Sequence, residues 1–466
     1  MKNIALWVIA ITLAGMLISG FILTLRGTES NKAETEVANT GTEVDKTETK
    51  AANTGIEVAK TATLVIAASN SLSKSGADYV CDGVDDQEEI NAAIDALPSG
   101  GKVLLLEGTY SLSSYLRIKK NDITLEGMGP ASILKIADGA VSNPLIIGEG
   151  TTEYSDITVR DLAFDGNREN ATGTGYSILY YKVRRLTIED CYFHDTRGVG
   201  ISFASIGADY QSHDVKILNN TFKNIGLADH SKNGNAIRFG NVLGGIISGN
   251  NIDGVEGSMS WGAIDIADES KYVSVIGNHI RNTYPAGIQV ETDAEYVTIT
   301  GNTIYVAHRA GIVVTKCAQS FARYITITSN IIEHCDGPGI ILQDDSVKHC
   351  TIANNIISDN GQNAEGLMSA AGIHLEACEY VSVIGNQVFD TNVASGWTQN
   401  PQILVSHAKH IVIADNVCFG GSVSLKFVYD IADIIAENNL LENYQDFPIQ
   451  FVSGASPLEV TYDDRK

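Results

Sequence analysis

One eight-residue pattern recurs through most of the chain: apolar, polar, apolar, any residue, small or polar, Asn, any residue, apolar. Its copies run from VKILNNTF to DIIAENNL and place the Asn at Asn220, Asn250, Asn278, Asn302, Asn330, Asn355, Asn386, Asn416 and Asn438. Two earlier copies, ITVRDLAF and LTIEDCYF, carry Leu162 and Cys191 instead. Repeats of about 20–50 residues are typical of a solenoid, because no single unit can bury its apolar face alone.

Each repeat also holds a second short apolar strand, such as GAIDIA at 262–267 or AGIQVE at 286–291. Apolar residues at every second position put one face of such a strand inward. The unit is therefore a coil of three short strands. We expect the repeated Asn to occupy a left-handed corner between two strands, where its amide bonds the next coil about 4.8 Å away.

The segment before the repeats carries a recognisable set of turns. Asp82-Gly83, Gly100-Gly101, Gly108-Thr109-Tyr110 and the stretch LEGMG at 125–129 surround an apolar stripe with helical spacing. Asp85 is the expected helix N-cap, with Glu88 completing a capping box.

These features resemble the right-handed parallel β-helix proteins of the pectate-lyase-like superfamily, over roughly residues 76–452. The resemblance implies an all-β fold, a right-handed parallel β-helix with an N-terminal α-helix that closes the open end of the solenoid. The superfamily contains lyases, hydrolases, epimerases, phage tailspikes and binding proteins, so the fold alone does not select an activity.

Composition divides the chain into four parts. Residues 1–27 contain an apolar run at 4–25, long enough to cross a bilayer of about 30 Å, and are predicted to be a membrane anchor or a signal segment. Residues 28–62 are a low-complexity linker. Residues 63–455 form the predicted β-helix domain, with its cap at 76–101 and about a dozen coils, before a polar tail at 456–466.

The charge balance restricts the partners. The 466 residues include 32 Lys and Arg against 56 Asp and Glu, a net charge of −24. Nucleic acid is excluded as the expected partner, because phosphate binding needs clustered basic residues. An acidic polysaccharide would need a cation between the two, so Ca²⁺ is the candidate cofactor, with no ligands assigned.

The seven cysteines contain no CxxC pair. Cys191 and Cys418 fall at core-facing positions of the repeat, so buried free thiols are the expectation. A Cys317–Cys335 or a Cys335–Cys350 disulfide remains an open alternative.

The resemblance places a substrate groove on the strand before each Asn turn, and its outward residues form two polar clusters. In the first, Asp265 and Glu291 are the candidate catalytic pair, spaced by roughly 8 Å, which suits an inverting glycosidase. In the second, His374 is a candidate base that Glu376 orients. The remaining candidates are substrate-binding residues: Arg238, Asp268, Gln289, Trp261, Lys316, Gln343, Asp344, Trp397 and His407.

The function expected from these observations is that of an exported β-helix protein, anchored at the cell surface or secreted, that binds polysaccharide. If it is an enzyme, it is a polysaccharide lyase, a glycoside hydrolase or an epimerase. The chain has no polygalacturonase set of motifs and no YGFDPH-like stretch of the alginate epimerases. The alternative is therefore a non-catalytic structural or adhesive protein of the cell envelope.

Overall fold

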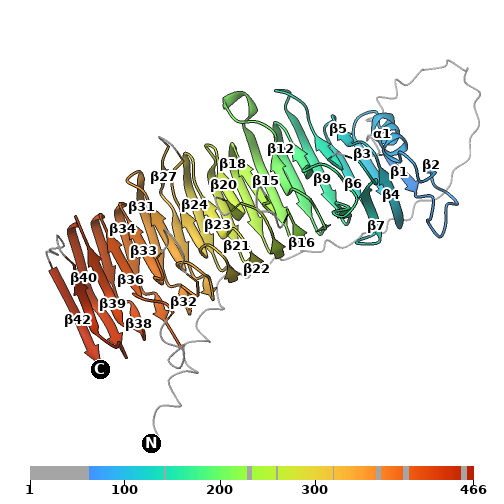
Figure 1. Ribbon diagram of the computed structural model, residues 1–466. Helices are drawn as coiled ribbons and strands as arrows, with labels where there is room; N and C mark the ends of the chain where they lie inside the picture. The colour runs from blue at the N-terminus through green and yellow to red at the C-terminus, as the bar shows by residue number, and fades with distance from the viewer. Residues whose placement is uncertain are drawn as a thin grey trace, which may run out of the picture. The chain divides into compact units, whose positions relative to one another are not determined.

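The fold is a parallel β-solenoid, described in a computed structural model for residues 62–140, 143–227, 234–258, 261–317, 320–363, 369–391, 398–452 and 459–465. Each strand pairs in parallel with the equivalent strands of the coils before and after it. The coils stack in chain order, so the colour changes steadily along the stack (Figure 1). This arrangement confirms the predicted β-helix repeat.

Three series of strands make up the coils. One forms a separate sheet of thirteen strands, called the groove sheet below. Its strands are β5 (Leu116–Ile118), β8 (Leu145–Ile147), β11 (Tyr176–Tyr180), β14 (Val199–Phe203), β17 (Ile237–Gly240), β20 (Gly262–Ala267), β23 (Ala286–Val290), β26 (Ile312–Val314), β30 (Ile340–Gln343), β33 (Ile373–Glu376), β36 (Ile403–Ser406), β39 (Val423–Val428) and β41 (Phe447–Phe451).

The second series follows the groove sheet in each coil. Its strands are β3 (Gly101–Leu105), β6 (Ile123–Glu126), β9 (Tyr154–Arg160), β12 (Val183–Glu189), β15 (Ser212–Leu218), β18 (Val242–Ser248), β21 (Lys271–Ile276), β24 (Ala294–Thr300), β27 (Ala322–Arg323), β28 (Thr326–Thr328), β31 (Val347–Ala353), β34 (Glu379–Ile384), β37 (Lys409–Ala414) and β40 (Ala432–Glu442). At the two ends it is joined by β1 (Ala62–Ala67), which pairs with β3, and β42 (Glu459–Arg465), which pairs with β40. The predicted polar tail therefore contains a strand.

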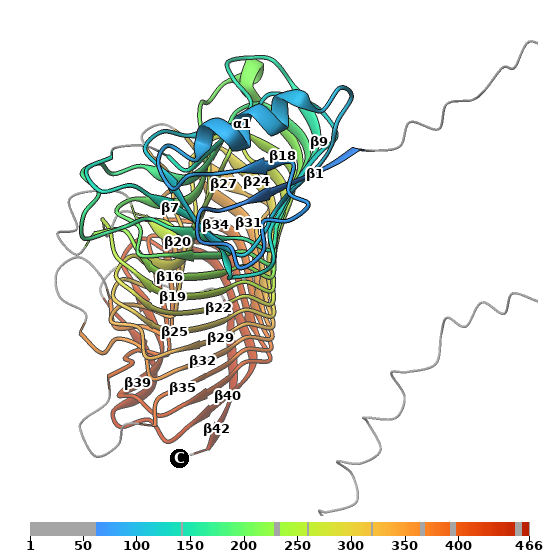
Figure 2. The same ribbon diagram turned by 90° about the vertical axis from the view of Figure 1, so that its right-hand side faces the viewer.

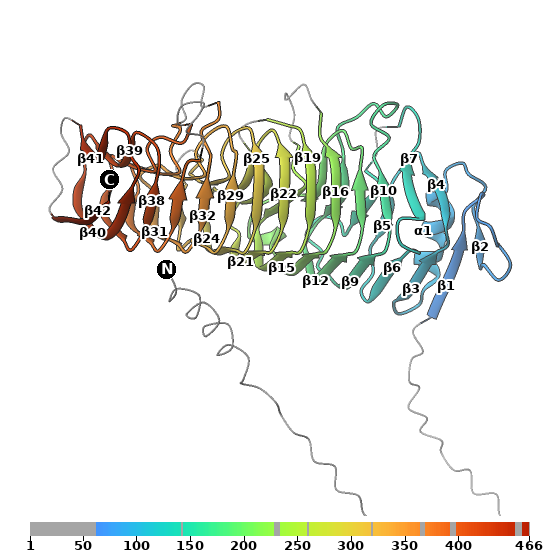
Figure 3. The same cartoon turned by 90° about the horizontal axis from the view of Figure 1, so that it is seen from below.

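The third series follows the Asn turn, and its strands lie side by side in Figure 3. They are β4 (Gly108–Leu112), β7 (Ser132–Ile136), β10 (Ala163–Asp165), β13 (Tyr192–His194), β16 (Thr221–Ile225), β19 (Asn251–Val255), β22 (His279–Thr283), β25 (Thr303–Ala307), β29 (Ile331–Glu333), β32 (Ile356–Ser358), β35 (Gln387–Phe389) and β38 (Val417–Phe419). A two-residue strand, β2 (Tyr79–Val80), pairs with β1, and a short 3₁₀ helix spans Ala208–Tyr210.

The inward faces of the three series form one continuous core. In β24, for example, Val297 and Ile299 are buried while the residues between and beside them are partly exposed. Identical side-chain types also stack from coil to coil, and the rings of Phe164, Phe193 and Phe222 lie 4.8 Å apart. Each buried side chain of this size contributes about 1.5–3 kcal/mol.

The predicted Asn column is present and continuous. Each Asn Nδ2 donates to the Oδ1 of the Asn one coil further on, for example Asn278 to Asn302 at 2.9 Å and Asn302 to Asn330 at 2.9 Å. Nδ2 also donates to a backbone carbonyl of the preceding coil, as from Asn302 to Val275. We call this column the Asn ladder.

Two details of the prediction are wrong. The last member of the ladder is Asn439, which accepts a hydrogen bond from Asn416 at 3.0 Å, and not Asn438. The left-handed residue is also the one before the ladder Asn, such as Asn438 (φ 55°) or Gly277 (φ 61°). The corner therefore consists of a left-handed residue, such as Gly277 or Asn438, followed by the Asn whose side-chain amide forms the ladder.

Helix α1 (Gln87–Ala96) lies against the first coils, across the end of the stack in Figure 2. Its buried face joins the continuous core through Ile90, Ala93 and Ile94. The predicted capping box is wrong, because the N-cap is Asp86 and no side chain caps the helix. The Asp86 carboxylate instead accepts from the backbone N–H groups of Gly83 and Ser111, both at 2.7 Å, and ties the helix start to β4.

All seven cysteines are free, which excludes both candidate disulfides in this structure. Cys317 is exposed and the other six are buried. The predicted apolar segment 4–25 and linker 28–62 lie outside the described residues, apart from Ala62 in β1. Within the described residues, no helix has the length and apolar character needed to cross a membrane.

Candidate functional site

The outward column of the groove sheet has the predicted register. Arg238 of β17, Asp265 of β20 and Gln289 of β23 are successive neighbours, followed by Val313, Ile341 and His374. The column is nevertheless covered rather than open. Ala286, Ala310, Val313 and Ile341 form a small buried apolar cluster of their own, which separates a polar group at one end from a second polar group at the other.

The first polar group is centred on Arg238. Its Nε lies 3.1 Å from Asp265 Oδ2, and its Nη2 donates to Asp268 Oδ2 at 3.1 Å. The guanidinium also lies over the ring of Trp261 (4.3 Å to the centroid) and near that of Phe203 (5.3 Å). Two carboxylates and two rings therefore fix the position of this arginine.

A glycine makes room for this arrangement. A Cβ on Gly240, two residues after Arg238, would lie 2.1 Å from the ring of Phe203. The strand thus carries Gly where the aromatic ring needs its space, and the ring in turn lies beside the guanidinium.

A second arginine completes the group. Arg309, in the loop after β25, donates from Nη1 to Gln289 Oε1 at 2.7 Å, and Gln289 Nε2 donates to Glu291 Oε2 at 2.9 Å. The sequence analysis did not select Arg309. The sequence did contain a signal for it, because Arg309 lies two residues before the groove strand GIVV of the next coil.

Burial dominates the electrostatics of this group. Asp265 is 0% exposed, and its contact with Arg238 is an ion pair in which the N–H is not aimed at the oxygen, so neither carboxylate oxygen has a hydrogen bond within the described residues. Burial first, and then the nearby charge of Glu291, raise the pKa of Asp265 well above its usual value, and Arg238 only partly opposes this.

Burial also favours the uncharged form of the neighbouring side chains. Burial raises the pKa of Glu291, against the hydrogen bond from Gln289 and the charge of Arg238. Burial also raises the pKa of Asp268 and lowers the pKa of Arg309. A carboxyl group with a raised pKa can act as a general acid in its protonated form and as a base once it is ionised.

The second polar group surrounds His374 on β33. Its Nδ1 lies 3.1 Å from Ser369 Oγ and its Nε2 lies 3.2 Å from Ser406 Oγ. The ring is therefore held by two hydroxyls, and among the described residues no hydrogen bond joins it to Glu376, the partner that the sequence analysis expected. Burial lowers the pKa of His374 to about 4, so the imidazole is neutral at pH 7.

The other predicted residues make separate contacts. Gln343 and Glu376 are register neighbours, and burial together with the charge of Asp344 raises the pKa of Glu376. Lys316 pairs with Asp345 and is not part of the Arg238 group. His407 stacks on Tyr429 at 5.0 Å. Trp397 lies outside the described residues.

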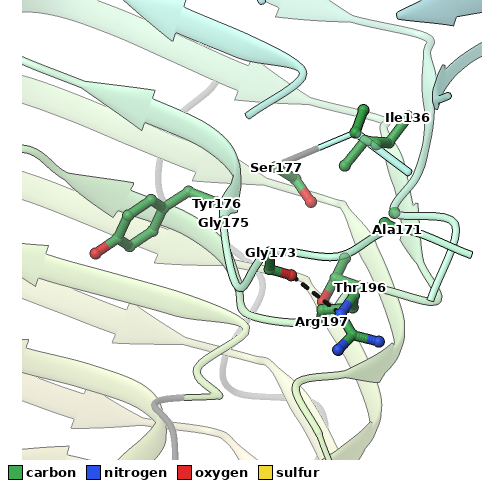
Figure 4. Close-up of a pocket in the computed structure, with 10 residues that line it drawn as sticks. Ile136, Ala171, Gly173, Gly175, Tyr176, Ser177, Thr196 and Arg197 are labelled. Carbon is green, nitrogen blue, oxygen red and sulfur yellow. Dashed lines mark hydrogen bonds between the residues drawn. The ribbon is translucent and has the colours of Figure 1, made fainter. Parts of the chain in front are cut away.

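A small, partly open pocket lies elsewhere, near β11. It measures about 20 Å³ and is lined by residues that include Gly166, Tyr176 and Thr196. Arg197 donates from Nε to the Gly173 carbonyl at 3.0 Å at its edge (Figure 4). This volume holds about one water molecule, so the cavity is too small for a sugar.

Comparison with known proteins identifies the family. A family model described as "Right handed beta helix region" matches residues 205–323 and 286–463, which together cover more than half of the chain. The chain belongs to the right-handed β-helix family. The sequence resemblance to right-handed β-helix proteins is thereby confirmed.

A relative and two solved structures add detail to this β-helix chain. The Mannuronan C5-epimerase AlgE4 of Azotobacter vinelandii is 37% identical over 106 residues, which span only 20% of this chain and 19% of that protein. The AlgE6 A-module of the same organism superposes with a TM-score of 0.57 at 17% identity, covering 82% of this chain and 96% of the module.

The second structure is PfbA, a surface adhesin of Streptococcus pneumoniae, with a TM-score of 0.50 at 16% identity over 79% of this chain and 90% of PfbA. At such identities the two structures share the β-helix fold with this chain. One is an epimerase module and the other an adhesin, so the fold is compatible with both classes of function.

Proposed function

We propose that this β-helix protein binds polysaccharide at the Arg238 group on the groove sheet. The observation that carries the proposal is the position of Arg238, held between the rings of Trp261 and Phe203 and by the carboxylates of Asp265 and Asp268. Core packing does not need a buried arrangement of this kind, because burying charges is unfavourable unless they are paired. Perturbed carboxyls beside fixed arginines are typical of functional sites.

The residues divide into positioning and contact roles. Asp265 is fully buried, so it positions Arg238, whereas Glu291, at 8% exposure, is the carboxyl nearer the surface. Arg238 and Arg309 offer guanidinium donors to sugar hydroxyls or carboxylates. Trp261 offers an aromatic ring of the kind that packs on sugar rings. The mannuronan in the name of the relative favours a uronate polymer as the ligand.

Processing of the bound chain is the second candidate function. Glu291 would exchange the proton in hydrolysis while Asp265 holds Arg238 in position, and His374 would take a proton in a lyase or epimerase step, with Glu376 nearby. The adhesin among the structural neighbours supports the non-catalytic alternative. In either case we place the protein outside the cytoplasm, held by residues 4–25 or secreted, with α1 closing the end of the solenoid.

Calcium does not fit the described residues as a protein-built site. Within them, one group of three candidate ligands converges, Cys81, Asp86 and Glu89. A thiol is a poor ligand for Ca²⁺, and both oxygens of Asp86 already accept backbone hydrogen bonds.

The test compares Arg309→Met with Arg281→Met. Arg281 is an exposed arginine on β22, paired with Asp253, so its variant is the matched control for the loss of one guanidinium. Binding to mannuronan, other uronans and neutral glucans is measured with and without Ca²⁺, and the products are analysed for new reducing ends, unsaturation and epimerisation. We expect Arg309→Met to weaken uronan binding at least about tenfold and to lower the melting temperature while unfolding stays cooperative, because the buried Gln289 loses one hydrogen-bond donor. Arg281→Met should bind normally. Normal binding by both variants would refute the assignment.

A further inference from the structure

Six consecutive coils carry an aromatic residue at the same corner, where the groove sheet turns into the second series of strands. The row consists of Tyr272, Tyr296, Tyr324, His349, Tyr380 and His410, and is called the aromatic row below. All six have a left-handed backbone, with φ between 56° and 59°. Five of them lie on β21, β24, β31, β34 and β37, and Tyr324 directly follows β27. The strands β21, β24, β27, β31 and β34 follow one another along the stack (Figure 1).

The corner itself does not require aromatic residues. The equivalent positions in other coils are Asp156, Arg185, Asp214 and Gly244 before the row and Asp433 after it, all with positive φ. Gly, Asn and Asp adopt this conformation readily, whereas a bulky side chain is unfavourable there by about 1–2 kcal/mol. Six aromatic residues in succession therefore need another explanation.

Ring stacking supplies part of that explanation. Neighbouring rings of the row lie 4.5–5.2 Å apart and within 13° of parallel. Such a contact contributes about 0.5–1.5 kcal/mol per pair, which is about as large as the backbone strain at each residue and so does no more than offset it. Because each ring covers its neighbour's face, the row presents ring edges and hydroxyls to solvent, and Tyr272 is 58% and Tyr296 42% exposed.

A second row of hydroxyl groups runs beside the first. Ser274, Thr298 and Thr326 are register neighbours two residues further along their strands, and Thr351 and Ser382 continue the row. Between the two rows lies an open groove of about 570 Å³. Its lining consists of Tyr272, Ser274, Tyr296, Thr298, Tyr324, Thr326 and His349.

The lining of the groove contains one imidazole, that of His349, and no Asp, Glu, Lys or Arg side chain. The charged residues that precede the aromatic row pair with one another: Glu295 binds Lys271 at 2.7 Å and Arg323 at 3.3 Å, and Glu379 binds Lys348 at 2.8 Å. The lining therefore offers a polyanion no lysine or arginine side chain. A peptide strand would find no free sheet edge, because these strands pair on both sides.

We propose that this groove is a second glycan site, which binds an uncharged polysaccharide strand lying along the solenoid axis. Hydroxyls of Tyr, Ser and Thr both donate and accept hydrogen bonds, as sugar hydroxyls do. The same pair of rows returns in five consecutive coils, so a polymer of repeated sugar units gains one set of contacts per coil along that stretch. The site is separate from the Arg238 group, and it stands or falls independently of the function proposed there.

The test removes phenolic hydroxyls without removing rings. The variant Tyr272→Phe, Tyr296→Phe, Tyr324→Phe keeps the stacking, and Tyr305→Phe with Tyr429→Phe is the matched control, because both tyrosines are exposed and lie outside the groove. Binding of neutral gluco-, xylo- and manno-oligosaccharides of increasing length to the full chain is measured by calorimetry, with melting temperatures in parallel. We expect affinity to rise with length, and the triple variant to lose at least about tenfold, since each lost hydrogen bond is worth roughly 0.5–1.5 kcal/mol, while its melting temperature is unchanged.

A second pair of variants tests the other row. Thr298→Val with Thr326→Val removes two groove hydroxyls at nearly constant volume, and Thr187→Val is the control in the same column of a coil without an aromatic residue. Unchanged affinity in the triple Phe and the double Val variants would overturn the proposal. It would also be overturned if the triple variant altered self-association in ultracentrifugation and left glycan binding intact, since the row would then be an interface between copies. Loss of neutral-glycan binding only in Arg309→Met would place that ligand on the groove sheet and equally refute it.

Discussion

Removing one amide from the Asn ladder should destabilise the protein far more than removing a neighbouring side chain. Asn302 is fully buried in the middle of the ladder. Its Oδ1 accepts from both the backbone N–H and Nδ2 of Asn278, each at 2.9 Å, and its Nδ2 donates to Val275 and Asn330, each at 2.9 Å. The substitution Asn302→Ala removes all of these bonds.

The magnitude follows from what is left unpaired. The Nδ2 of Asn278 keeps its bond to the Ile247 carbonyl at 3.0 Å, but its backbone N–H loses its acceptor inside the core. One buried donor without a partner is unfavourable by about 1–3 kcal/mol, and the other lost bonds together add roughly 1 kcal/mol, because Asn278 Nδ2 and Asn330 Oδ1 each keep another hydrogen bond. We therefore expect Asn302→Ala to lower the free energy of unfolding by about 2–4 kcal/mol.

The control is Thr303→Ala, the next residue, which is partly exposed on β25 and should change stability by less than about 1 kcal/mol. Urea unfolding followed by circular dichroism measures both, and equal slopes justify comparing the midpoints. Asn439→Ala should be intermediate, because this last member donates to Ile413 but has no further Asn to bond. Coincident midpoints for Asn302→Ala and Thr303→Ala would refute the stabilising role of the ladder.

Two further predictions concern titration and thiol access. The pKa of His374 is lowered to about 4, so below about pH 6.5 the folded state binds fewer protons than the unfolded state. The free energy of unfolding should therefore be highest above about pH 6.5 and fall by about 3 kcal/mol as the pH is lowered through 4. His374→Asn should abolish that part of the acid sensitivity in urea unfolding at pH 7 and 4.5, and an unchanged pH profile would contradict the burial of a neutral ring. Native protein should react quickly with a thiol reagent at one cysteine, Cys317, and Cys317→Ser should remove that fast phase; rapid labelling at a second site would show that the core thiols are accessible.

Much of the local geometry was predictable because it repeats. The register Arg238, Asp265, Gln289 follows from strand alternation and coil period, and both are visible in the sequence. The prediction of the ladder failed where two Asn residues are adjacent in one repeat. The sequence allows either Asn438 or Asn439 to be the ladder residue. Only the hydrogen bond from Asn416 in the stacked coil selects Asn439.

The sequence alone determined the coil, its three strands and the ladder, because these depend on periodicity and on interactions that recur with the same spacing in every repeat. Only the tertiary structure decided which outward residues reach solvent. Alternation placed Asp265 and His374 outward, yet Asp265 is 0% exposed beside Arg238, and His374 lies between the hydroxyls of Ser369 and Ser406. Conversely, the corner tyrosines, scattered in the sequence, become one exposed row only when the coils stack. Side-chain contacts over the groove sheet and ring stacking between coils are long-range contacts, which the pattern within a single repeat does not encode.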